Sequence, residues 1–308
     1  MSLLRYVLAV ALLLLASQST DAQFWPVRPL GTSVLTAPYT GPGDCSGCTP
    51  LSWWFGLRAY SAATAGTTPA VNICSESGGS DVTCEDEQTS ASTGKLVLGT
   101  VGSACSSVAC TFKIWYDPTE NNYCSSAPCN YTQTTVANRA TFLITGCPLS
   151  GPCAQFAANT CYTSPGSVST NPPMSFSTVF EFTNAVAGNV FIDNAGNVET
   201  GYFLSGADAF IYAKAVDFST PATASTPLSV QTADDSAVSS GSVVDANGTS
   251  TTGTLTAISG TLPETLGAIS CSTSPLIGYL WEGGFVNSLF TGGNMSSLTT
   301  NQRTFWGF

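Results

Sequence analysis

The chain of 308 residues carries 8 Lys and Arg against 19 Asp and Glu, a formal net charge of −11, and has no histidine. This charge argues against nucleic acid and anionic membranes as partners, because both need a basic patch. Without histidine, Ser-His-Asp and Cys-His nucleophiles and His-ligated metal sites are excluded. Carboxylates and tyrosines remain for catalysis. We predict no cofactor, with a calcium ion held by oxygen ligands as the alternative.

The first 22 residues have the pattern of a secretion signal. Arg5 precedes an apolar run from Tyr6 to Ala16, and small residues follow at Thr20 and Ala22. The run is shorter than the roughly 20 residues that a membrane-spanning helix needs. We therefore predict a signal peptide over 1–22, with an uncleaved anchor as the alternative. An extended leader over 23–50 and a single domain over 51–308 would follow in a secreted or periplasmic protein.

Twelve cysteines in an exported chain predict six disulfides. The motif Cys45-Ser-Gly-Cys48 could also indicate redox or zinc chemistry, but no second motif of this kind accompanies it. A structural role is therefore the preferred interpretation. Proximity in the sequence favours the pairs Cys74–Cys84, Cys105–Cys110, Cys124–Cys129 and Cys147–Cys153, with Cys45–Cys48 and Cys161–Cys271 as the remainder.

The remaining pattern is mostly that of short strands. Leu51–Thr64 has apolar residues at helical spacing and predicts a helix. The Pro- and Ser-rich stretch Thr163–Pro173 is interpreted as a long loop, Asn247-Gly248 predicts a hairpin turn, and Asn294–Trp306 predicts a helix with Ser296 or Ser297 near its cap. Strands are predicted over 95–100, 110–115, 140–144, 175–183, 189–192, 201–204, 210–215, 228–232, 242–244, 253–258 and 276–285. Together these elements predict an all-β protein, a jelly roll or sandwich of two antiparallel sheets stapled by disulfides.

Three stretches resemble the catalytic module of arabinofuranosidase B. The first runs from Gly41-Pro42-Gly43-Asp44-Cys45 to Arg58-Ala59-Tyr60-Ser61. The second is the pair Cys105 and Cys110 followed by Trp115-Tyr116-Asp117 and, after an insertion, Thr132-Gln133. The third is Trp281-Glu282-Gly283-Gly284-Phe285 with the helix that follows it. The resemblance implies a concanavalin A-like fold over the mature chain and a glycoside hydrolase that uses two carboxylates.

The resemblance also points to positions at which this chain differs. The acid of the family would fall in Ser270–Ser274, where this sequence has no carboxylate, and no two cysteines are adjacent as they are in the family's substrate pocket. For the nucleophile, Glu181 and Glu199 are the nearest residues in chain order. These differences favour a glycan-binding role on the same scaffold.

Glycoside hydrolysis needs two carboxyl groups on either side of the scissile bond, one of them kept protonated. We take Asp117, Glu181, Glu199 and Asp208 as the catalytic candidates. Asp117 could instead form a turn before Pro118, and Glu282 in the closing strand is assigned a structural role. The other acids beside apolar strands or in loops are Glu120, the run Glu85-Asp86-Glu87 (a solvated loop, with calcium binding as the alternative), and the turn acids Asp234, Asp235 and Asp245.

Aromatic rings can stack on the apolar faces of sugars. Trp115, Tyr116 and Trp281 are the predicted sugar-contacting rings, and a place in the core is the alternative for each. Three hypotheses follow: a secreted protein that binds a polysaccharide or other glycan, a retaining α-L-arabinofuranosidase, and an extracellular structural or adhesive protein. Two buried carboxylates within about 9 Å of each other would favour the enzyme.

Overall fold

The computed structural model describes residues 38–119, 129–169, 173–183, 189–192, 200–205, 208–213, 216–223, 225–234, 241–254, 261–268 and 275–308. All of them belong to one unit, Pro38–Phe308. The predicted signal peptide and the first part of the predicted leader lie outside the described residues. The rest of the leader forms turns and contacts the domain, for example through the Gly43 N–H, which donates to the Tyr60 carbonyl over 2.8 Å. Within the described ranges, no helix is long and apolar enough to cross a membrane.

An antiparallel sheet lies at the centre of the fold. Two strands share one edge of β19 (Gly278–Val286). β8 (Cys153–Phe156) pairs with the first residues of β19, and β1 (Trp53–Gly56) pairs with its later residues. In register, Phe176 of β10 lies opposite Phe285 of β19. The order of the main strands is β17 (Thr249–Gly253), β16 (Ser242–Ala246), β15 (Leu228–Asp234), β10 (Met174–Phe182), β19 (Gly278–Val286) and β1 (Trp53–Gly56).

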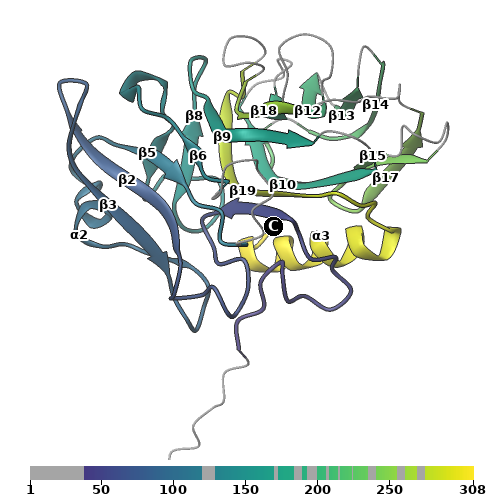
Figure 1. Cartoon of the computed structure of the whole chain (residues 1–308), viewed down its shortest axis with the longest axis horizontal. Coiled ribbons are helices and arrows are strands. Elements are labelled where there is room, and N and C mark those ends of the chain that lie inside the picture. Colours follow the sequence, from purple (N-terminus) through teal and green to yellow (C-terminus); the bar gives the residue numbers. More distant parts are fainter. Residues whose placement is uncertain are drawn as a thin grey trace, which may run out of the picture. The chain divides into compact units, whose positions relative to one another are not determined.

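A second antiparallel layer faces the first. In Figure 1 it lies above β10 and β15, whereas the C-terminal helix lies below them. The two layers and the helix therefore form the sandwich predicted from the sequence, with one sheet covered on both faces. The strands of the second layer are β14 (Val216–Pro221), β13 (Asp208–Ala213), β12 (Thr200–Ser205), β11 (Asn189–Ile192), β18 (Thr261–Leu266) and β9 (Tyr162–Ser169).

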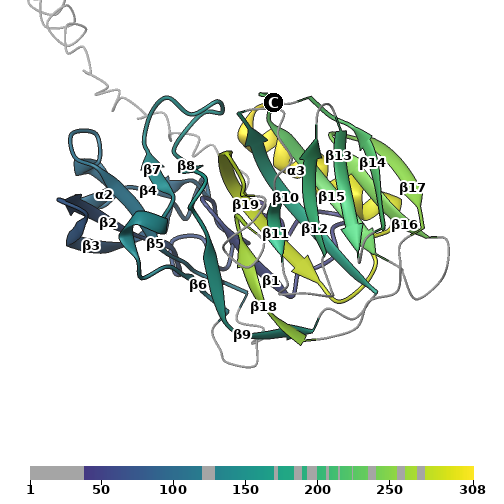
Figure 2. The ribbon, with the colours of Figure 1, turned by 90° about the horizontal axis from the view of Figure 1, so that it is seen from above.

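The N-terminal half adds a group of strands at one end of the sandwich (Figure 2). β2 and β3 form a long hairpin, β2 also pairs with β5, and β5 continues through β6 to β9 of the second layer. The elements of this half are β2 (Pro69–Ser77), β3 (Ser80–Thr89), β4 (Leu96–Val97), α2 (Thr100–Ala104), β5 (Cys110–Trp115), β6 (Tyr131–Thr132), the short 3-10 helix η1 (Val136–Asn138) and β7 (Thr141–Leu143).

The helix predicted over Leu51–Thr64 is wrong, because Trp53–Gly56 is strand β1. Trp53 and Phe55 point into the main core, whereas Trp54 packs in a second cluster with Leu298 of the C-terminal helix. A strand covered on both faces is apolar at every position and lacks the alternation of a half-exposed strand. The helix-like spacing of apolar residues is a consequence of this two-sided burial.

One further expectation about secondary structure is wrong, and one hairpin was not predicted. The predicted loop Thr163–Pro173 contains most of β9, and Thr163 pairs with Thr265 of β18. The long β2–β3 hairpin was not predicted at all. Much of β3 is polar and exposed, so neither strand shows a clear apolar pattern, and the cross-strand disulfide Cys74–Cys84 joins residues that lie directly opposite each other.

The disulfide predictions are confirmed wherever both cysteines are described. Cys129 and Cys161 are also disulfide-bonded, but Cys124 and Cys271 lie outside the described residues, so those two pairings stay predictions. No cysteine in the described part of the chain is free. The confirmed bonds are Cys45–Cys48, Cys74–Cys84, Cys105–Cys110 and Cys147–Cys153.

The C-terminal helix α3 (Gly292–Trp306) begins earlier than predicted. Its N-cap is Thr291, whose hydroxyl accepts from the Asn294 N–H over 3.3 Å while the Asn294 carboxamide accepts from the Thr291 N–H over 3.0 Å. This reciprocal pair is a capping box. The helix ends at Gly307, whose φ of 81° is the left-handed conformation typical of a glycine at this position.

A buried polar cluster attaches α3 to the sheet. The carbonyl oxygen of the fully buried Gln302 side chain accepts from the Ser229 hydroxyl over 2.6 Å and from the Gln231 amide over 2.7 Å. Its own amide donates to the Ser177 hydroxyl over 2.9 Å. Hydrogen bonds inside a protein are directional, so this cluster fixes how far α3 is rotated about its axis on the sheet.

The predicted Asn-Gly turn is confirmed between β16 and β17. Asn247 and Gly248 have φ angles of 53° and 92°, as a two-residue type I′ hairpin requires. The Asp245 carboxylate accepts from the Gly248 N–H over 2.9 Å, which confirms its role as a turn acid. Asp234, predicted to be another turn acid, is instead fully buried at the end of β15, and Asp235 lies outside the described residues.

We expect Gly248→Ala to lower the free energy of unfolding by about 1–2 kcal/mol, because a residue with a Cβ is disfavoured at positive φ. Gly293→Ala in the first turn of α3 is the matched control. The nearest atom to its added Cβ would be Thr291 Oγ1 at 3.7 Å, so we expect unchanged or slightly higher stability. Chemical denaturation with intact disulfides measures both, and equal effects would show that the turn does not need glycine.

Candidate functional site

Asp117 lies just after β5 and is 7% exposed. Its Oδ1 atom accepts from the Thr119 hydroxyl over 2.8 Å, from the Thr119 N–H over 3.0 Å and from the Trp54 N–H over 3.3 Å. Burial raises the pKa of this carboxyl to about 6, against the opposing effect of those hydrogen bonds. Asp117 is therefore both the turn-forming residue considered from the sequence and an acid that keeps its proton up to about pH 6.

Glu181 lies on β10 and is 5% exposed. Its Oε2 atom is buried and has no hydrogen-bond partner. Burial raises the pKa of this carboxyl above its usual range, because the charged form loses its hydration. Glu181 is therefore a second acid with an elevated pKa.

The register of the central sheet separates these two acids. Asp117 accepts from the backbone of Trp54, which lies opposite Gly284 of β19, whereas Glu181 lies opposite Tyr279 of the same strand. Five residues along a strand span about 16 Å. A glycosidase pair needs a separation of about 5–9.5 Å, so the described residues do not bring Asp117 and Glu181 together as such a pair.

The other predicted acids are placed only in part. Asp208 begins β13, and its backbone pairs with Pro221 of β14 in the second layer. Glu120 and Glu199 lie outside the described residues. A role for Asp208 or Glu199 therefore stays a prediction.

Two of the three predicted sugar-contacting rings lie in the core. Trp115 is fully buried and stacks on Phe112, with ring centroids 4.7 Å apart. Trp281 is also fully buried, beside Trp306 of α3. Neither ring offers a face to a ligand. Both belong to the core, which was the alternative to sugar contact. Tyr116 alone is partly exposed, and its hydroxyl donates to Asp86 over 2.7 Å.

Glu282 has a structural position, as its place in the closing strand predicted. Its carboxylate accepts from Arg58 through Nε, at 2.5 Å, and through Nη2, at 2.8 Å, and both side chains are fully buried. The Arg58 guanidinium also lies 4.7 Å from the centroid of the Phe305 ring on α3, a cation–π contact. Each charge is neutralised by the other, so neither is available to a ligand.

The expectation of a solvated loop at Glu85-Asp86-Glu87 is wrong, because these residues belong to β3. Glu87 is buried and accepts from the Gly99 and Gly102 N–H groups, and Glu85 accepts from the Val101 N–H. Backbone donors at the start of α2 thus take up carboxylate oxygens that a calcium ion would need. The pKa of Glu87 is raised, chiefly by burial.

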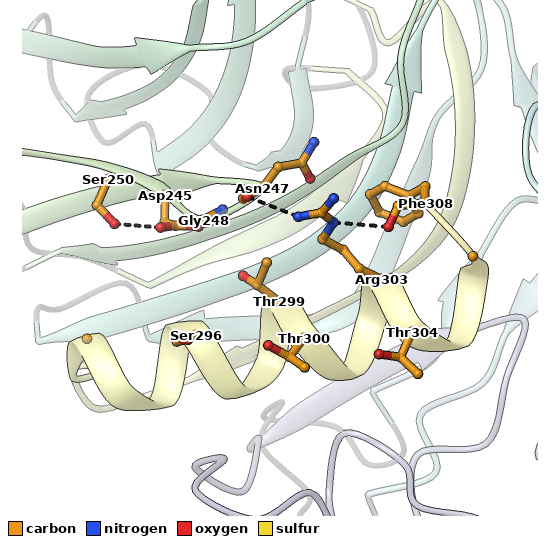
Figure 3. A pocket seen from close by; sticks show the side chains of 12 residues that line it. Asp245, Asn247, Gly248, Ser250, Ser296, Thr299, Thr300, Arg303, Thr304 and Phe308 are labelled. Carbon is orange, nitrogen blue, oxygen red and sulfur yellow. Dashed lines mark hydrogen bonds between the residues drawn. The ribbon is translucent and has the colours of Figure 1, made fainter.

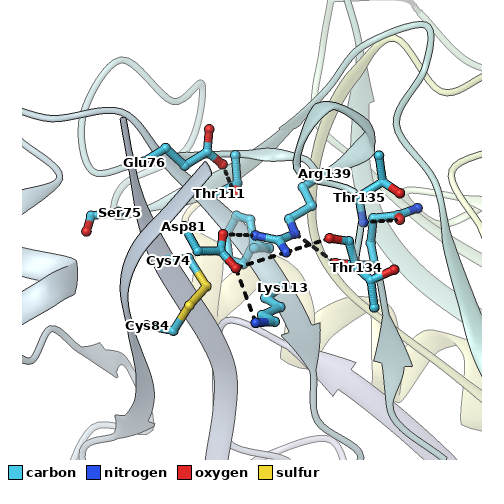
Figure 4. A network of polar contacts seen from close by, with 12 residues as sticks. Cys74, Ser75, Glu76, Asp81, Cys84, Thr111, Lys113, Thr134, Thr135 and Arg139 are labelled. Atoms are coloured by element: carbon cyan, nitrogen blue, oxygen red, sulfur yellow. Dashed lines mark hydrogen bonds and ion pairs between the residues drawn. A yellow bond between two sulfur atoms is a disulfide. The ribbon is translucent and has the colours of Figure 1, made fainter. Parts of the chain in front are cut away.

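Asp81, Cys74 and Cys84 also lie close together, but the two cysteines are joined in a disulfide and offer no thiolate to a metal. Asp81 instead forms ion pairs with Arg139 over 2.5 Å and with Lys113 over 3.2 Å (Figure 4). The hydrogen bond from Arg139 is the main reason that the pKa of Asp81 is lowered. This cluster ties the tip of the β2–β3 hairpin to β5 and the segment after β6.

A groove with a volume of about 670 Å³ lies between α3 and the β16–β17 hairpin (Figure 3). This volume is within the range of small-molecule pockets. No sequence motif marked the groove. The signal that could have indicated it is the spacing of hydroxyl residues four apart along the predicted helix. The lining residues are Asp245, Asn247, Gly248, Ser250, Gly292, Ser296, Thr299, Thr300, Arg303, Thr304, Gly307 and Phe308.

Hydroxyl groups and one aromatic ring give this α3–hairpin groove its chemistry. Arg303 donates to the carbonyl oxygens of Asn247 over 3.3 Å and of Phe308 over 3.1 Å, and its guanidinium lies 5.8 Å from the Phe308 ring centroid. Arg303 thereby holds the ring at one end of the groove. Thr299 extends from α3 towards the hairpin (Figure 3), is 5% exposed, and has an Oγ1 atom without a hydrogen-bond partner.

The β-sandwich is similar in fold to solved arabinofuranosidase structures, which confirms the predicted resemblance at the level of the fold. The chain is similar to a GH54 α-L-arabinofuranosidase soaked with a cyclic sulfate inhibitor (TM-score 0.63, 15% identity, 87% of this chain and 66% of that chain). A mutant of a GH54 α-L-arabinofuranosidase soaked with 4-nitrophenyl α-L-arabinofuranoside matches with a TM-score of 0.64 at 14% identity, over 87% and 66% of the two chains.

An arabinofuranosidase in complex with arabinofuranosyl-α-1,2-xylobiose is also similar, with a TM-score of 0.62 and 13% identity over 87% of this chain and 65% of that chain. This chain thus spans about two-thirds of the length of these structures. No profile of a known protein family and no curated protein sequence matches it. Because the identities are this low, the similarity is one of fold.

Proposed function

We propose that the protein is an exported glycan-binding protein that holds carbohydrate in the α3–hairpin groove. The observation that carries the proposal is the lining of the groove on this fold: exposed hydroxyls of Ser250, Ser296 and Thr300 beside the partly exposed Phe308 ring. Sugars offer hydroxyls for hydrogen bonding and apolar faces for packing against a ring. Structures of the same fold carry sugar ligands, which supports a carbohydrate over other small molecules.

Export is part of the proposal. The signal-like pattern over 1–22 and the disulfides of the described residues support it, because disulfides persist in oxidising compartments. N-terminal sequencing of the protein from the medium or periplasm should give a start shortly after Ala22. An intact Met1 in the exported protein would contradict the signal peptide.

We expect the mature protein to bind plant-type polysaccharides on a glycan array and arabinoxylan in calorimetry. Phe308→Ala should weaken this binding about tenfold, because it removes the ring that would pack on a sugar face. Val97→Ala, on β4, is the matched control, since Val97 is 51% exposed and does not line the groove. A folded, disulfide-intact sample that binds no glycan would refute the proposal.

A retaining α-L-arabinofuranosidase is the second candidate. The raised pKa of the buried Asp117 carboxyl favours it, because a general acid must hold its proton near the working pH. Chromogenic arabinofuranosides assayed with Asp117→Asn, Glu181→Gln and Glu199→Gln variants would test it. Turnover that one of these variants abolishes would establish the enzyme. If the protein showed neither turnover nor glycan binding, a structural or adhesive protein would be the remaining interpretation.

A further inference from the structure

A second groove, of about 470 Å³, lies on the opposite flank of α3. It is bounded by the segment Tyr39–Ser46 on one side and by the helix on the other. Ser296, Thr300 and Thr304 line both grooves. These three residues follow one another at intervals of four, so they lie one above the other along the helix and form a ridge between the grooves.

The ridge presents only short hydroxyl side chains. Ser296, Thr300 and Thr304 are all exposed. The exposed face of a helix in a soluble domain is ordinarily covered by long charged side chains, and threonine is a weak helix former. Here no long side chain stands on the ridge between the two grooves, and its hydroxyls can both donate and accept hydrogen bonds.

From this arrangement we propose that the two grooves are subsites for one extended, uncharged glycan chain that crosses α3 over the Ser296–Thr300–Thr304 ridge. The inference rests on the proposed glycan-binding function and names its ligand class, a linear oligosaccharide or polysaccharide. The crossing is about one helix diameter, ~10 Å, which is wider than a single sugar ring. A monosaccharide would fill only one of the two grooves.

Each groove contains a buried oxygen that has no hydrogen-bond partner. In the first it is Thr299 Oγ1, on a side chain that is 5% exposed, and in the second it is Asn301 Oδ1. The Asn301 amide donates to the Thr40 carbonyl over 3.1 Å, which fixes the orientation of the side chain. Buried polar atoms are normally paired, so these two oxygens are places where ligand hydroxyls would complete the hydrogen bonding.

The charges in the first groove favour an uncharged ligand. Arg303 donates through Nε to the backbone oxygen of Phe308 and through Nη1 to that of Asn247. The Asp245 carboxylate accepts from the Gly248 N–H and from the Ser250 hydroxyl. Each of these two ionic side chains thus already has hydrogen-bond partners within the protein, and the groove's hydroxyls and its ring are the other groups that can meet the ligand. The second groove offers Tyr39 and Phe305, whose ring centroids lie 5.9 Å apart.

Calorimetry with disaccharides and hexasaccharides of xylan, arabinan and arabinoxylan tests the inference. If the two subsites are linked, the protein should bind the hexasaccharide of the preferred glycan with about a hundredfold higher affinity than the disaccharide, because the second contact becomes intramolecular. Equal affinities at both lengths would overturn the inference and leave the proposed function standing. Absence of binding at every length would overturn both.

A ridge variant sharpens the test. Thr300→Gln places a longer side chain on the ridge at an exposed position where glutamine is the better helix former. It should weaken binding of the hexasaccharide much more than binding of the disaccharide, because only the longer ligand has to cross the ridge, whereas the disaccharide loses at most the contact with the Thr300 hydroxyl in its own groove. Thr83→Gln, exposed on β3, is the matched control and should change neither. An equal loss at both lengths in Thr300→Gln, with the far-UV spectrum unchanged, would show that the ligand occupies one groove only.

Discussion

Glu282→Gln should lower the free energy of unfolding by about 3–5 kcal/mol, because it leaves the Arg58 guanidinium as an unpaired buried charge. Both side chains are fully buried, and two hydrogen bonds of 2.5 and 2.8 Å join them. The guanidinium is also enclosed by the Phe305 ring at 4.7 Å. The guanidinium cannot be hydrated again without displacing α3, so the loss of its partner lowers the free energy of unfolding.

Denaturant unfolding of the disulfide-intact protein measures this effect. Lys113→Met is the control, because it breaks a partly exposed pair with Asp81 and should cost less than about 1 kcal/mol. The double variant Arg58→Met with Glu282→Leu should recover much of the loss, since apolar residues often replace a buried ion pair at little cost. A loss for Glu282→Gln no larger than that for Lys113→Met would show that the pair is hydrated in solution.

Asp117→Asn should leave stability unchanged at pH 4 and raise it at pH 7 by about 2–3 kcal/mol. The folded-state pKa is near 6 and the unfolded value near 3.8, so the folded protein holds a proton that the unfolded chain has lost between these values. The contribution of Asp117 to the free energy of unfolding is therefore largest below about pH 4. It falls as the pH rises to about 6 and stays low above that. Each unit of pKa difference corresponds to about 1.4 kcal/mol.

The measurement is the unfolding free energy of both proteins between pH 4 and 7.5, compared as a difference. Glu87 and Glu181 also have raised pKa values and Asp81 a lowered one. These groups are common to both proteins and cancel in the difference. Asparagine keeps the Oδ1 acceptor for Trp54 and Thr119, so the change removes charge and little else. A difference that does not vary with pH would contradict the raised pKa of Asp117.

The sequence predicted the C-terminal half of the fold better than the N-terminal half, for a physical reason. β10, β15 and β16 each contain β-branched residues, with three phenylalanines in β10, and lie between turn residues, so local composition is enough to identify them. The β2–β3 hairpin is mainly polar and is joined by a disulfide between facing residues. β1 is covered on both faces, so its pattern carries no information about which face is buried.

The candidate site was harder to predict, because exposure depends on the tertiary fold. Trp115 and Trp281 have the residue type of a sugar-stacking ring, yet the packing places both in the core. The elevated pKa values of Asp117 and Glu181 follow from burial, which depends on the tertiary packing and was not predicted. The α3–hairpin groove joins the β16–β17 hairpin to the C-terminal helix, and no local pattern relates these two segments.

The pairing of β1 with β19 also governs when the protein can fold. Arg58 and Glu282 are 224 residues apart in the sequence, and strand β1 occupies an edge of β19, which is synthesised after every other described strand. While the chain is still emerging from the ribosome, Trp53 and Trp54 have no sheet to join. Contacts between such distant segments slow folding, so the nascent protein keeps the apolar strand β1 uncovered until β19 has been synthesised. A cell that makes this protein must protect Trp53–Gly56 from aggregation throughout that interval.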